Sequence, residues 1–170
     1  MKALLLAGGY GKRLGLKKKS KCMAKVNGKP ILEHLVEHLK KAGITEIIIK
    51  VHHKPLKIME YFGTRVLYYY ETKLLDVEQS EKLLSDWLGD QYIVMNGDTL
   101  TNINIKKLMK LGSDRRYPTS VYFVKERYGG TKFVNTLTDR EYDWDGDGAY
   151  YFDIGSKSRL AKARRLLKNG

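Results

Sequence analysis

The chain has 170 residues, of which 42% are hydrophobic, and these values predict one soluble domain with a sizeable core. Its formal net charge of +13 predicts anionic partners, either nucleic acid or ligands that carry several phosphates. The single cysteine, Cys22, excludes an internal disulfide and has no companions for a zinc site. The apolar run at residues 3–7 is too short for a secretory signal or a membrane span, so we expect a cytoplasmic protein without membrane contact.

Apolar patterns alternate between strand and helix along the first 112 residues. They predict strands at 3–7, 46–51, 65–71 and 92–95, and helices at 30–42, 54–62, 77–88 and 105–111. The strand runs lack strict alternation, which is typical of parallel strands covered by helices on both faces. The later part of the chain predicts strands at 119–125, 132–137 and 148–154 and a basic helix from residue 157. The expected fold is therefore a single α/β domain over residues 1–170, with three layers, a Rossmann-like architecture and a mostly parallel sheet.

A glycine-rich turn and a basic pair follow the first predicted strand. Gly8, Gly9 and Gly11 come directly after it, and Lys12 and Arg13 follow. At the carboxyl edge of a parallel sheet, such glycines let backbone N–H groups approach phosphates, so the turn is a candidate phosphate cradle. A tight turn without a ligand is the alternative. The spacing fits neither a P-loop, which needs Ser or Thr after Gly-Lys, nor the Gly-x-Gly-x-x-Gly dinucleotide fingerprint.

Four motifs resemble, in order and spacing, the nucleotidyltransferases that join a nucleoside triphosphate to a sugar 1-phosphate. The segment LAGGYGKRL at residues 6–14 is similar to the family's loop L-A-G-G-x-G-T-R-L, and residues 21–32 resemble its second element. The segments GITEI at 43–47 and NGD at 96–98 also match. The resemblance implies an unusually short member of the family, nearest to the branch of heptose and mannose 1-phosphate guanylyltransferases.

The resemblance also implies roles for the residues that match. Arg13 and Lys21 would act in catalysis by neutralising phosphate charge. Asp98 and Asp153 would hold Mg²⁺, and we expect both at strand ends on one edge of the parallel sheet. A turn or helix-capping role is the alternative for each aspartate. The nucleotide would contact Leu6, Ala7, Gly8, Gly9, Gly11, Lys12, Gln79, Asn96 and Gly97.

Two segments depart from the family pattern. Residues 74–80 contain no glycine where relatives carry a Gly-rich stretch that accepts the base, so the base is left open. Between residues 125 and 148 the elements that hold the sugar phosphate are shortened, which predicts a smaller or more open acceptor site. Lys125 and Lys132 are both candidates for the missing acceptor lysine, and Lys25 is a candidate extra contact.

The expected function is Mg²⁺-dependent transfer of a nucleoside monophosphate from a nucleoside triphosphate to a phosphorylated acceptor, with release of pyrophosphate. A sugar 1-phosphate is the favoured acceptor, and a phosphorylated alcohol or amino-acid derivative is the alternative. A basic nucleic-acid-binding protein is the less favoured rival, and a nucleotide binder without turnover is a third hypothesis. The sequence leaves the oligomeric state open.

Two further patterns are interpreted as structural and not as metal sites. Residues 143–148 fit the first half of a calcium loop, but Ile154 stands at its twelfth position in place of glutamate, so we expect a turn near the acceptor pocket. The four histidines, His34, His38, His52 and His53, have no metal-ligand spacing, and we expect surface or packing roles.

Overall fold

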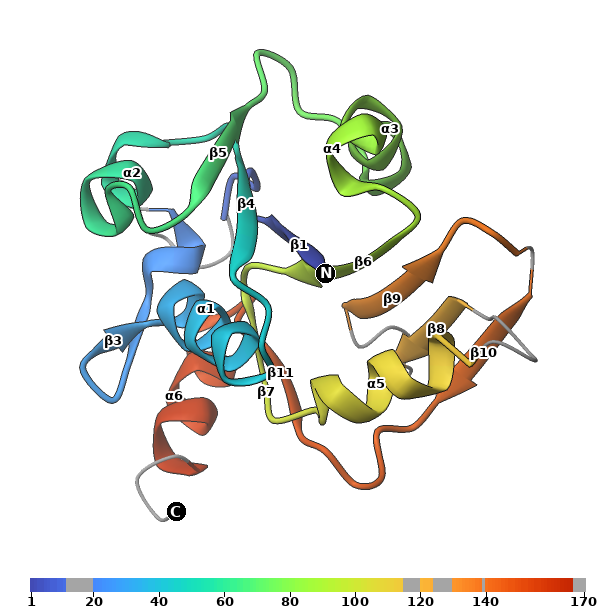
Figure 1. The fold of residues 1–170 in the computed structure, drawn as a ribbon. Helices are drawn as coiled ribbons and strands as arrows, with labels where there is room; N and C mark the ends of the chain where they lie inside the picture. Colours follow the sequence, from blue (N-terminus) through green and yellow to red (C-terminus); the bar gives the residue numbers. More distant parts are fainter. Residues whose placement is uncertain (12–19, 115–119, 124–129, 139, 167–170) are drawn as a thin grey trace.

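The structure is a computed structural model that describes residues 1–11, 20–114, 120–123, 130–138 and 140–166. Its main feature is a seven-stranded sheet in the order β10-β8-β9-β6-β1-β4-β5 (Figure 1). These strands are β1 (Lys2–Leu6), β4 (Glu46–Val51), β5 (Leu67–Tyr70), β6 (Gln91–Asn96), β8 (Ser120–Phe123), β9 (Thr131–Asn135) and β10 (Glu141–Trp144).

The sheet is mostly parallel, as predicted. Strands β5, β4, β1 and β6 pair in parallel, and so do β8 and β10. Only β9 runs antiparallel to its described neighbours, β6 and β8. The chain moves from β1 outward to β4 and β5 and then returns to place β6 on the other side of β1. The strand order therefore reverses at β1, and in open α/β sheets ligands bind outside the carboxyl ends of the strands at such a switch point.

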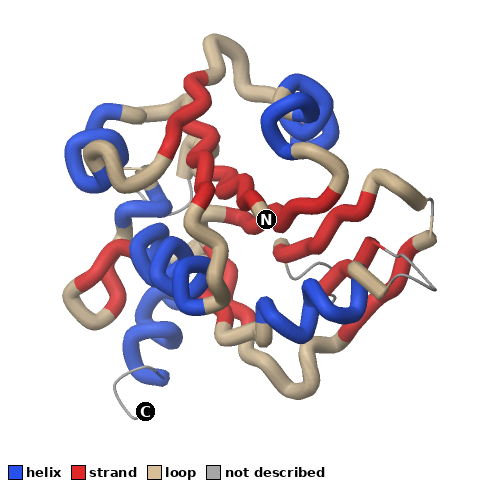
Figure 2. Tube along the Cα trace, viewed as in Figure 1, coloured by secondary structure: helices blue, strands red, loops and turns tan. Residues whose placement is uncertain are grey.

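Helices cover both faces of the sheet, which gives the three layers (Figure 2). On one face, α1 (Ile31–Lys41), α2 (Leu56–Phe62) and α5 (Ile105–Gly112) pack against side chains such as Ala3 and Leu5. On the other face, α4 (Ser85–Leu88) and Leu84, which separates it from α3 (Val77–Leu83), pack against Leu4 and Val94. Because consecutive β1 residues face opposite layers and both are apolar, the strand reads as a continuous apolar run.

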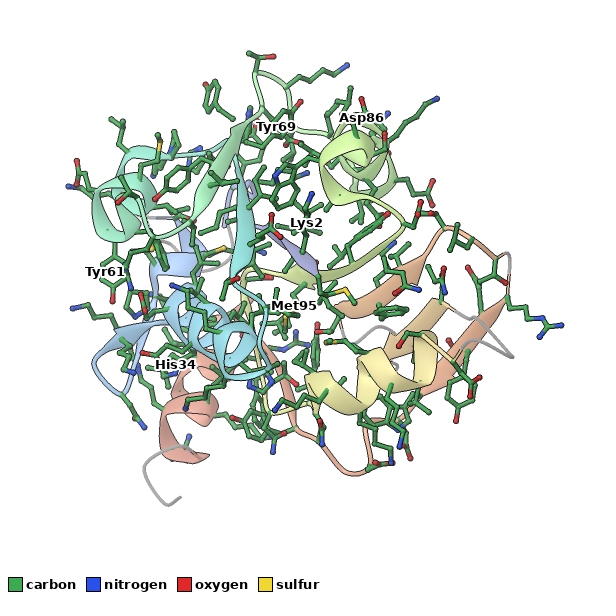
Figure 3. The ribbon with its side chains drawn as sticks, in the orientation of Figure 1. Lys2, His34, Tyr61, Tyr69, Asp86 and Met95 are labelled. Carbon is green, nitrogen blue, oxygen red and sulfur yellow. The ribbon has the colours of Figure 1, made fainter. Side chains whose placement is uncertain are left out.

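The helical layers leave a buried interior and a polar periphery. Met95 of β6 is fully buried and lies between the sheet and the helices, whereas Tyr61 and Asp86 lie at the outside (Figure 3). None of the helices in the described part of the chain combines the length and apolar character needed to cross a bilayer.

A second, smaller unit lies beside the main sheet. Strand β7 (Thr99–Thr101) pairs antiparallel with β11 (Tyr151–Asp153), and the basic helix α6 (Lys157–Leu166) follows. Helix α6 packs its apolar side with the hairpin of β2 (Lys25–Val26) and β3 (Lys29–Pro30), next to the 3-10 turn η2 (Lys21–Met23). This unit brings residues near position 153 back to the carboxyl edge of β6.

Several predicted bounds differ from the structure. The single helix expected at 77–88 is two helices, because Leu84 takes a non-helical conformation (φ −101°, ψ 7°) between them. Strands β7 and β10 and the β2–β3 hairpin were not expected, since each has only two to four residues and no long apolar run.

Candidate active site

A pocket of about 370 Å³ lies at the switch point, where β1, β4 and β6 end. Residues from six segments that are separate in the sequence meet there. Its lining consists of Leu6, Gly8, Gly9, Lys21, Lys50, Leu74, Leu75, Asp76, Val77, Asn96, Asp98, Tyr151 and Asp153. Seven of these were predicted from the sequence as site residues: Leu6, Gly8, Gly9, Lys21, Asn96, Asp98 and Asp153.

The glycine turn forms one wall of this pocket and is hydrogen-bonded to the end of β4. The Ala7 N–H donates to the Lys50 carbonyl at 2.9 Å, and the His53 N–H donates to the Gly8 carbonyl at 3.3 Å. A Cβ atom on Gly8 would lie 3.2 Å from the His52 Cβ, so glycine permits this close approach. Gly11 has φ +61° and packs against Lys21, while Lys12 and Arg13 lie outside the described residues.

The Asn96-Gly97-Asp98 segment forms the opposite wall, where β6 turns into β7. The Gly97 N–H donates to the Leu6 carbonyl at 2.9 Å, and an added Cβ would lie 2.9 Å from that same oxygen. Glycine is therefore required by packing against β1. This contact positions the neighbouring Asp98 in the lining of the pocket, where Asp98 is 8% exposed.

Lys21 and Asp98 form an ion pair inside the pocket. Burial by itself lowers the pKa of Lys21, but the charge and hydrogen bond of Asp98, with a weaker contribution from Asp153, hold that pKa above its ordinary value. The Lys21 side chain is thus a protonated cation that both carboxylates stabilise. Next to it, burial raises the pKa of the Cys22 thiol to about 12, so this thiol is not a nucleophile near neutral pH.

Asp153 lines the pocket, but the reason given by the sequence was wrong. It lies on β11, which pairs antiparallel with β7 outside the seven-stranded sheet, and not at the end of a parallel strand. Asp153 pairs with Thr99, and the Ile154 N–H donates to the Asp98 carbonyl at 2.9 Å. The β7–β11 ladder therefore brings the two aspartates together. Arg159 donates to Asp153 at 2.7 Å.

Gln79 does not line the pocket. Its side-chain oxygen accepts from the Asp76 N–H at 3.3 Å, and its own N–H donates to Asp76 at 2.8 Å, which together cap α3. The wall that the sequence assigned to the base consists of residues 74–77 together with Lys50. Sequence reasoning missed Lys50 and Tyr151, because only the fold brings them beside this segment.

A second cavity of about 660 Å³ adjoins the first and shares Leu6, Val77 and Asn96 with it. Three carboxylates and one lysine contribute to its lining: Glu78, Glu141, Asp143 and Lys132. Lys132 forms a 2.7 Å ion pair with Glu81, whereas Lys125 lies outside the described residues. Lys25 lines neither cavity and instead faces a separate hollow beside Arg164 and Arg165.

The remaining polar patterns have structural partners. Asp147 accepts from the Trp144 indole at 3.1 Å and pairs with Lys107, while its own N–H donates to Asp145, so the chain turns after Trp144, the last residue of β10. His34 and His38 contact the backbone carbonyls of Val26 and Ile103, at 2.9 and 2.7 Å. These contacts agree with the packing roles expected for the two residues.

Comparisons with known proteins found similar sequences. Residues 3–73 match the family model of the MobA-like NTP transferase domain. A D-glycero-alpha-D-manno-heptose 1-phosphate guanylyltransferase from Campylobacter jejuni is 38% identical over 115 residues, which cover 64% of this chain and 52% of that protein. The bifunctional protein GlmU from Acetivibrio thermocellus is 34% identical over 100 residues, which cover 57% of this chain and 22% of that protein. The chain thus spans about half or less of the length of these relatives.

The fold also matches solved structures. The crystal structure of HddC from Yersinia pseudotuberculosis has a TM-score of 0.76 and 20% sequence identity, over 98% of this chain and 99% of that one. The same protein complexed with GMP-PN gives a TM-score of 0.74. At this identity the likeness concerns the fold alone. The partial family match and the related sequences agree with the resemblance to sugar-phosphate nucleotidyltransferases that the motifs indicated, and the solved structures agree with the fold.

Proposed function

We propose that this chain transfers a nucleoside monophosphate from a nucleoside triphosphate to a phosphorylated acceptor, with a sugar 1-phosphate as the favoured acceptor. The observation that carries the proposal is the meeting of the glycine turn, Lys21, Asp98 and Asp153 in one pocket at the switch point. Backbone N–H groups and a cation align and neutralise a polyphosphate, and two carboxylates can hold the divalent cation that accompanies it.

The reaction needs no covalent protein intermediate. An acceptor phosphate oxygen attacks the α-phosphorus and forms the new P–O bond. The bond from the α-phosphorus to the bridging oxygen breaks, and pyrophosphate leaves. The protein contributes alignment and charge neutralisation. Lys21 would neutralise a phosphate in the pocket, and we propose the same for Arg13 toward pyrophosphate, because it follows the glycine turn in the sequence.

Asp98 and Asp153 fit a divalent cation. Both carboxylates act on the Lys21 ammonium, so the pair already accommodates one positive charge in the pocket. Mg²⁺ prefers oxygen ligands and commonly takes one or two carboxylates, with phosphates and water completing its shell. When bound, Mg²⁺ would neutralise triphosphate charge and orient the reacting phosphate.

The second cavity is a natural place for the acceptor. It adjoins the phosphate pocket through Leu6, Val77 and Asn96, so an acceptor there could present its phosphate to the α-phosphorus. Its Glu78, Glu141 and Asp143 carboxylates could accept hydrogen bonds from sugar hydroxyls.

The test incubates the protein with Mg²⁺, each of the four nucleoside triphosphates in turn, and a panel of sugar 1-phosphates and phosphorylated alcohols, and measures pyrophosphate. The proposal expects release that requires both substrates. Release that occurs with phosphorylated alcohols alone would change the acceptor class. No release from any pair, together with tight and strongly salt-dependent oligonucleotide binding, would favour the nucleic-acid-binding rival instead.

A further inference from the structure

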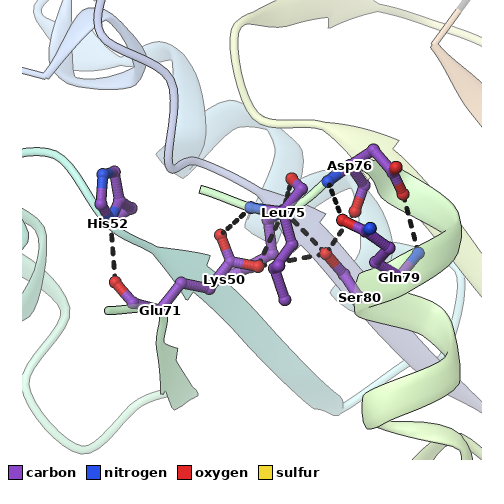
Figure 4. Close-up of polar contacts among 7 residues, drawn as sticks. All are labelled: Lys50, His52, Glu71, Leu75, Asp76, Gln79 and Ser80. Atoms are coloured by element: carbon purple, nitrogen blue, oxygen red, sulfur yellow. Dashed lines mark hydrogen bonds and ion pairs between the residues drawn. The ribbon is translucent and has the colours of Figure 1, made fainter. Parts of the chain in front are cut away.

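Lys50 is a buried cation for which the proposed reaction has no use. It is 3% exposed and lies in β4, within an apolar strand that the sequence reads as core. Its partner Glu71, directly after β5, is 2% exposed, and the two side chains form a 3.0 Å ion pair (Figure 4). Charges this deeply buried are costly and need full pairing, so their presence beside the nucleotide pocket calls for an explanation.

The Lys50 ammonium is hydrogen-bonded to the wall of the pocket that residues 74–77 form. It donates to the Leu75 carbonyl at 2.9 Å and to the Ser80 hydroxyl at 2.8 Å, besides its contact with Glu71. These three acceptors match the three N–H donors of an ammonium group, so none is left for a phosphate. Glu71 in turn accepts from the Leu75 N–H at 3.4 Å, and the Ser80 hydroxyl donates to the Asp76 carbonyl at 2.6 Å.

The same end of β4 also holds the glycine turn. The Lys50 carbonyl accepts from Ala7, and the His52 ring contacts the Tyr10 hydroxyl at 3.1 Å and the Glu71 carbonyl at 2.8 Å. Lys50 and its neighbours therefore connect the two sides of the pocket, the glycine turn on one side and residues 74–77 on the other. A change at Lys50 would alter the spacing between the two sides.

We propose that Lys50 is a positioning residue that, through Glu71 and Ser80, fixes residues 74–77 against the glycine turn and so sets nucleotide affinity and discrimination among bases. This rests on the proposed function for the identity of the ligand. The wall at residues 74–77 contains no glycine, and the buried Lys50–Glu71 ion pair holds it in a fixed shape. Because Lys50 has no donor left for a phosphate, its loss should change nucleotide affinity much more than the rate of the chemical step.

The experiment compares Lys50→Met, Glu71→Met and the double variant, with Lys57→Met as the matched control. Lys57 forms an exposed 2.8 Å ion pair with Glu60 on α2, away from the pocket. Thermal unfolding gives the Tm, and titration with each of the four nucleoside triphosphates gives the Kd. Each single variant leaves a buried charge unpaired and should lower the Tm, whereas the double variant should regain most of it.

The decisive result is the nucleotide affinity of the double variant. We expect its Kd for the preferred nucleotide to be about tenfold weaker than that of the wild type, since the Leu75 carbonyl has lost a charged hydrogen bond. The preference among bases should shrink, and Lys57→Met should match the wild type. A double variant that regains both the Tm and the wild-type Kd would overturn the positioning role. A wild type that binds no nucleotide would contradict the proposed function as well.

Discussion

Replacing Asp98 by asparagine tests the pocket electrostatics and the chemistry in one protein. Asp98 pairs with Lys21, and their side chains are 11% and 23% exposed, so the pair is largely shielded from water. Asparagine fills the same volume but removes the negative charge. A hydrogen bond between charged groups contributes about 1.5–3 kcal/mol, and the amide oxygen retains part of it, so we expect a loss of roughly 2 kcal/mol. For a chain of this size that loss lowers the Tm by about 4–8 °C.

The control is Asp147→Asn. Asp147 forms a lysine–aspartate pair with Lys107, but the two side chains are 45% and 54% exposed. Exposed pairs contribute little, so its Tm should stay within about 2 °C of the wild type. Both variants are measured without divalent metal, by calorimetry, and then assayed for pyrophosphate release, which Asp98→Asn should reduce by orders of magnitude and Asp147→Asn should leave intact.

The difference in Tm between the wild type and Asp98→Asn should depend on pH in a definite direction. The pKa of Lys21 lies above its ordinary value of 10.5 in the folded protein, so its stabilising contribution is complete below that pH and disappears as the pH rises through the folded pKa. The gap between wild type and Asp98→Asn should therefore be constant from about pH 6 to 9 and narrow in stronger alkali. An unchanged or higher Tm for Asp98→Asn near neutral pH would refute the ion pair as a stabilising contact.

Three further predictions follow from named contacts. Asp153→Asn should sharply reduce turnover, and the Asp98→Asn, Asp153→Asn double variant should be little slower than the worse single variant, because residues that act through one ion are not additive; additive losses in kcat would indicate separate roles. Gly97→Ala should destabilise the fold by about 1–3 kcal/mol, because the added Cβ meets the Leu6 carbonyl at 2.9 Å. In Gly9→Ala the added Cβ meets only the flexible end of Lys21, so the loss in unfolding free energy, measured by chemical denaturation, should be smaller. The free energy of unfolding should fall more steeply between pH 9.0 and about 12 in the wild type than in Cys22→Ala, because the Cys22 thiol ionises at a lower pH in the unfolded chain than in the folded protein. Equal slopes would show that folding does not raise the pKa of this thiol.

The main sheet could be predicted because its strands are long apolar runs. Residues 3–7 are wholly apolar, and residues 47–49 and 51 are apolar as well, a composition that buried parallel strands need on both faces. Strand β7, with three residues, and strand β10, with two acidic residues and one buried position, carry no comparable signal. Their pairing depends on partners elsewhere in the chain, which sequence periodicity does not encode.

The site was predictable where it follows from local motifs. The glycine turn, Lys21 and Asp98 each belong to a short pattern whose chemistry is recognisable, and the structure brings them into one pocket. Lys50 and Glu71 carried no such signal, because a lysine in an apolar strand gains its meaning only from a partner on the neighbouring strand. Asp153 was found through the resemblance, although the β7–β11 ladder that positions it was not foreseen.

The most direct test of the proposed transfer reaction is phosphorus NMR of the mixture of wild-type protein, Mg²⁺, nucleoside triphosphate and sugar 1-phosphate. If the acceptor phosphate attacks the α-phosphorus, the acceptor signal should move to that of a diphosphate ester coupled to the nucleotide, and pyrophosphate should grow at the same rate. Triphosphate signals that stay unchanged, or that yield inorganic phosphate without any change in the acceptor, would contradict nucleotidyl transfer by this chain.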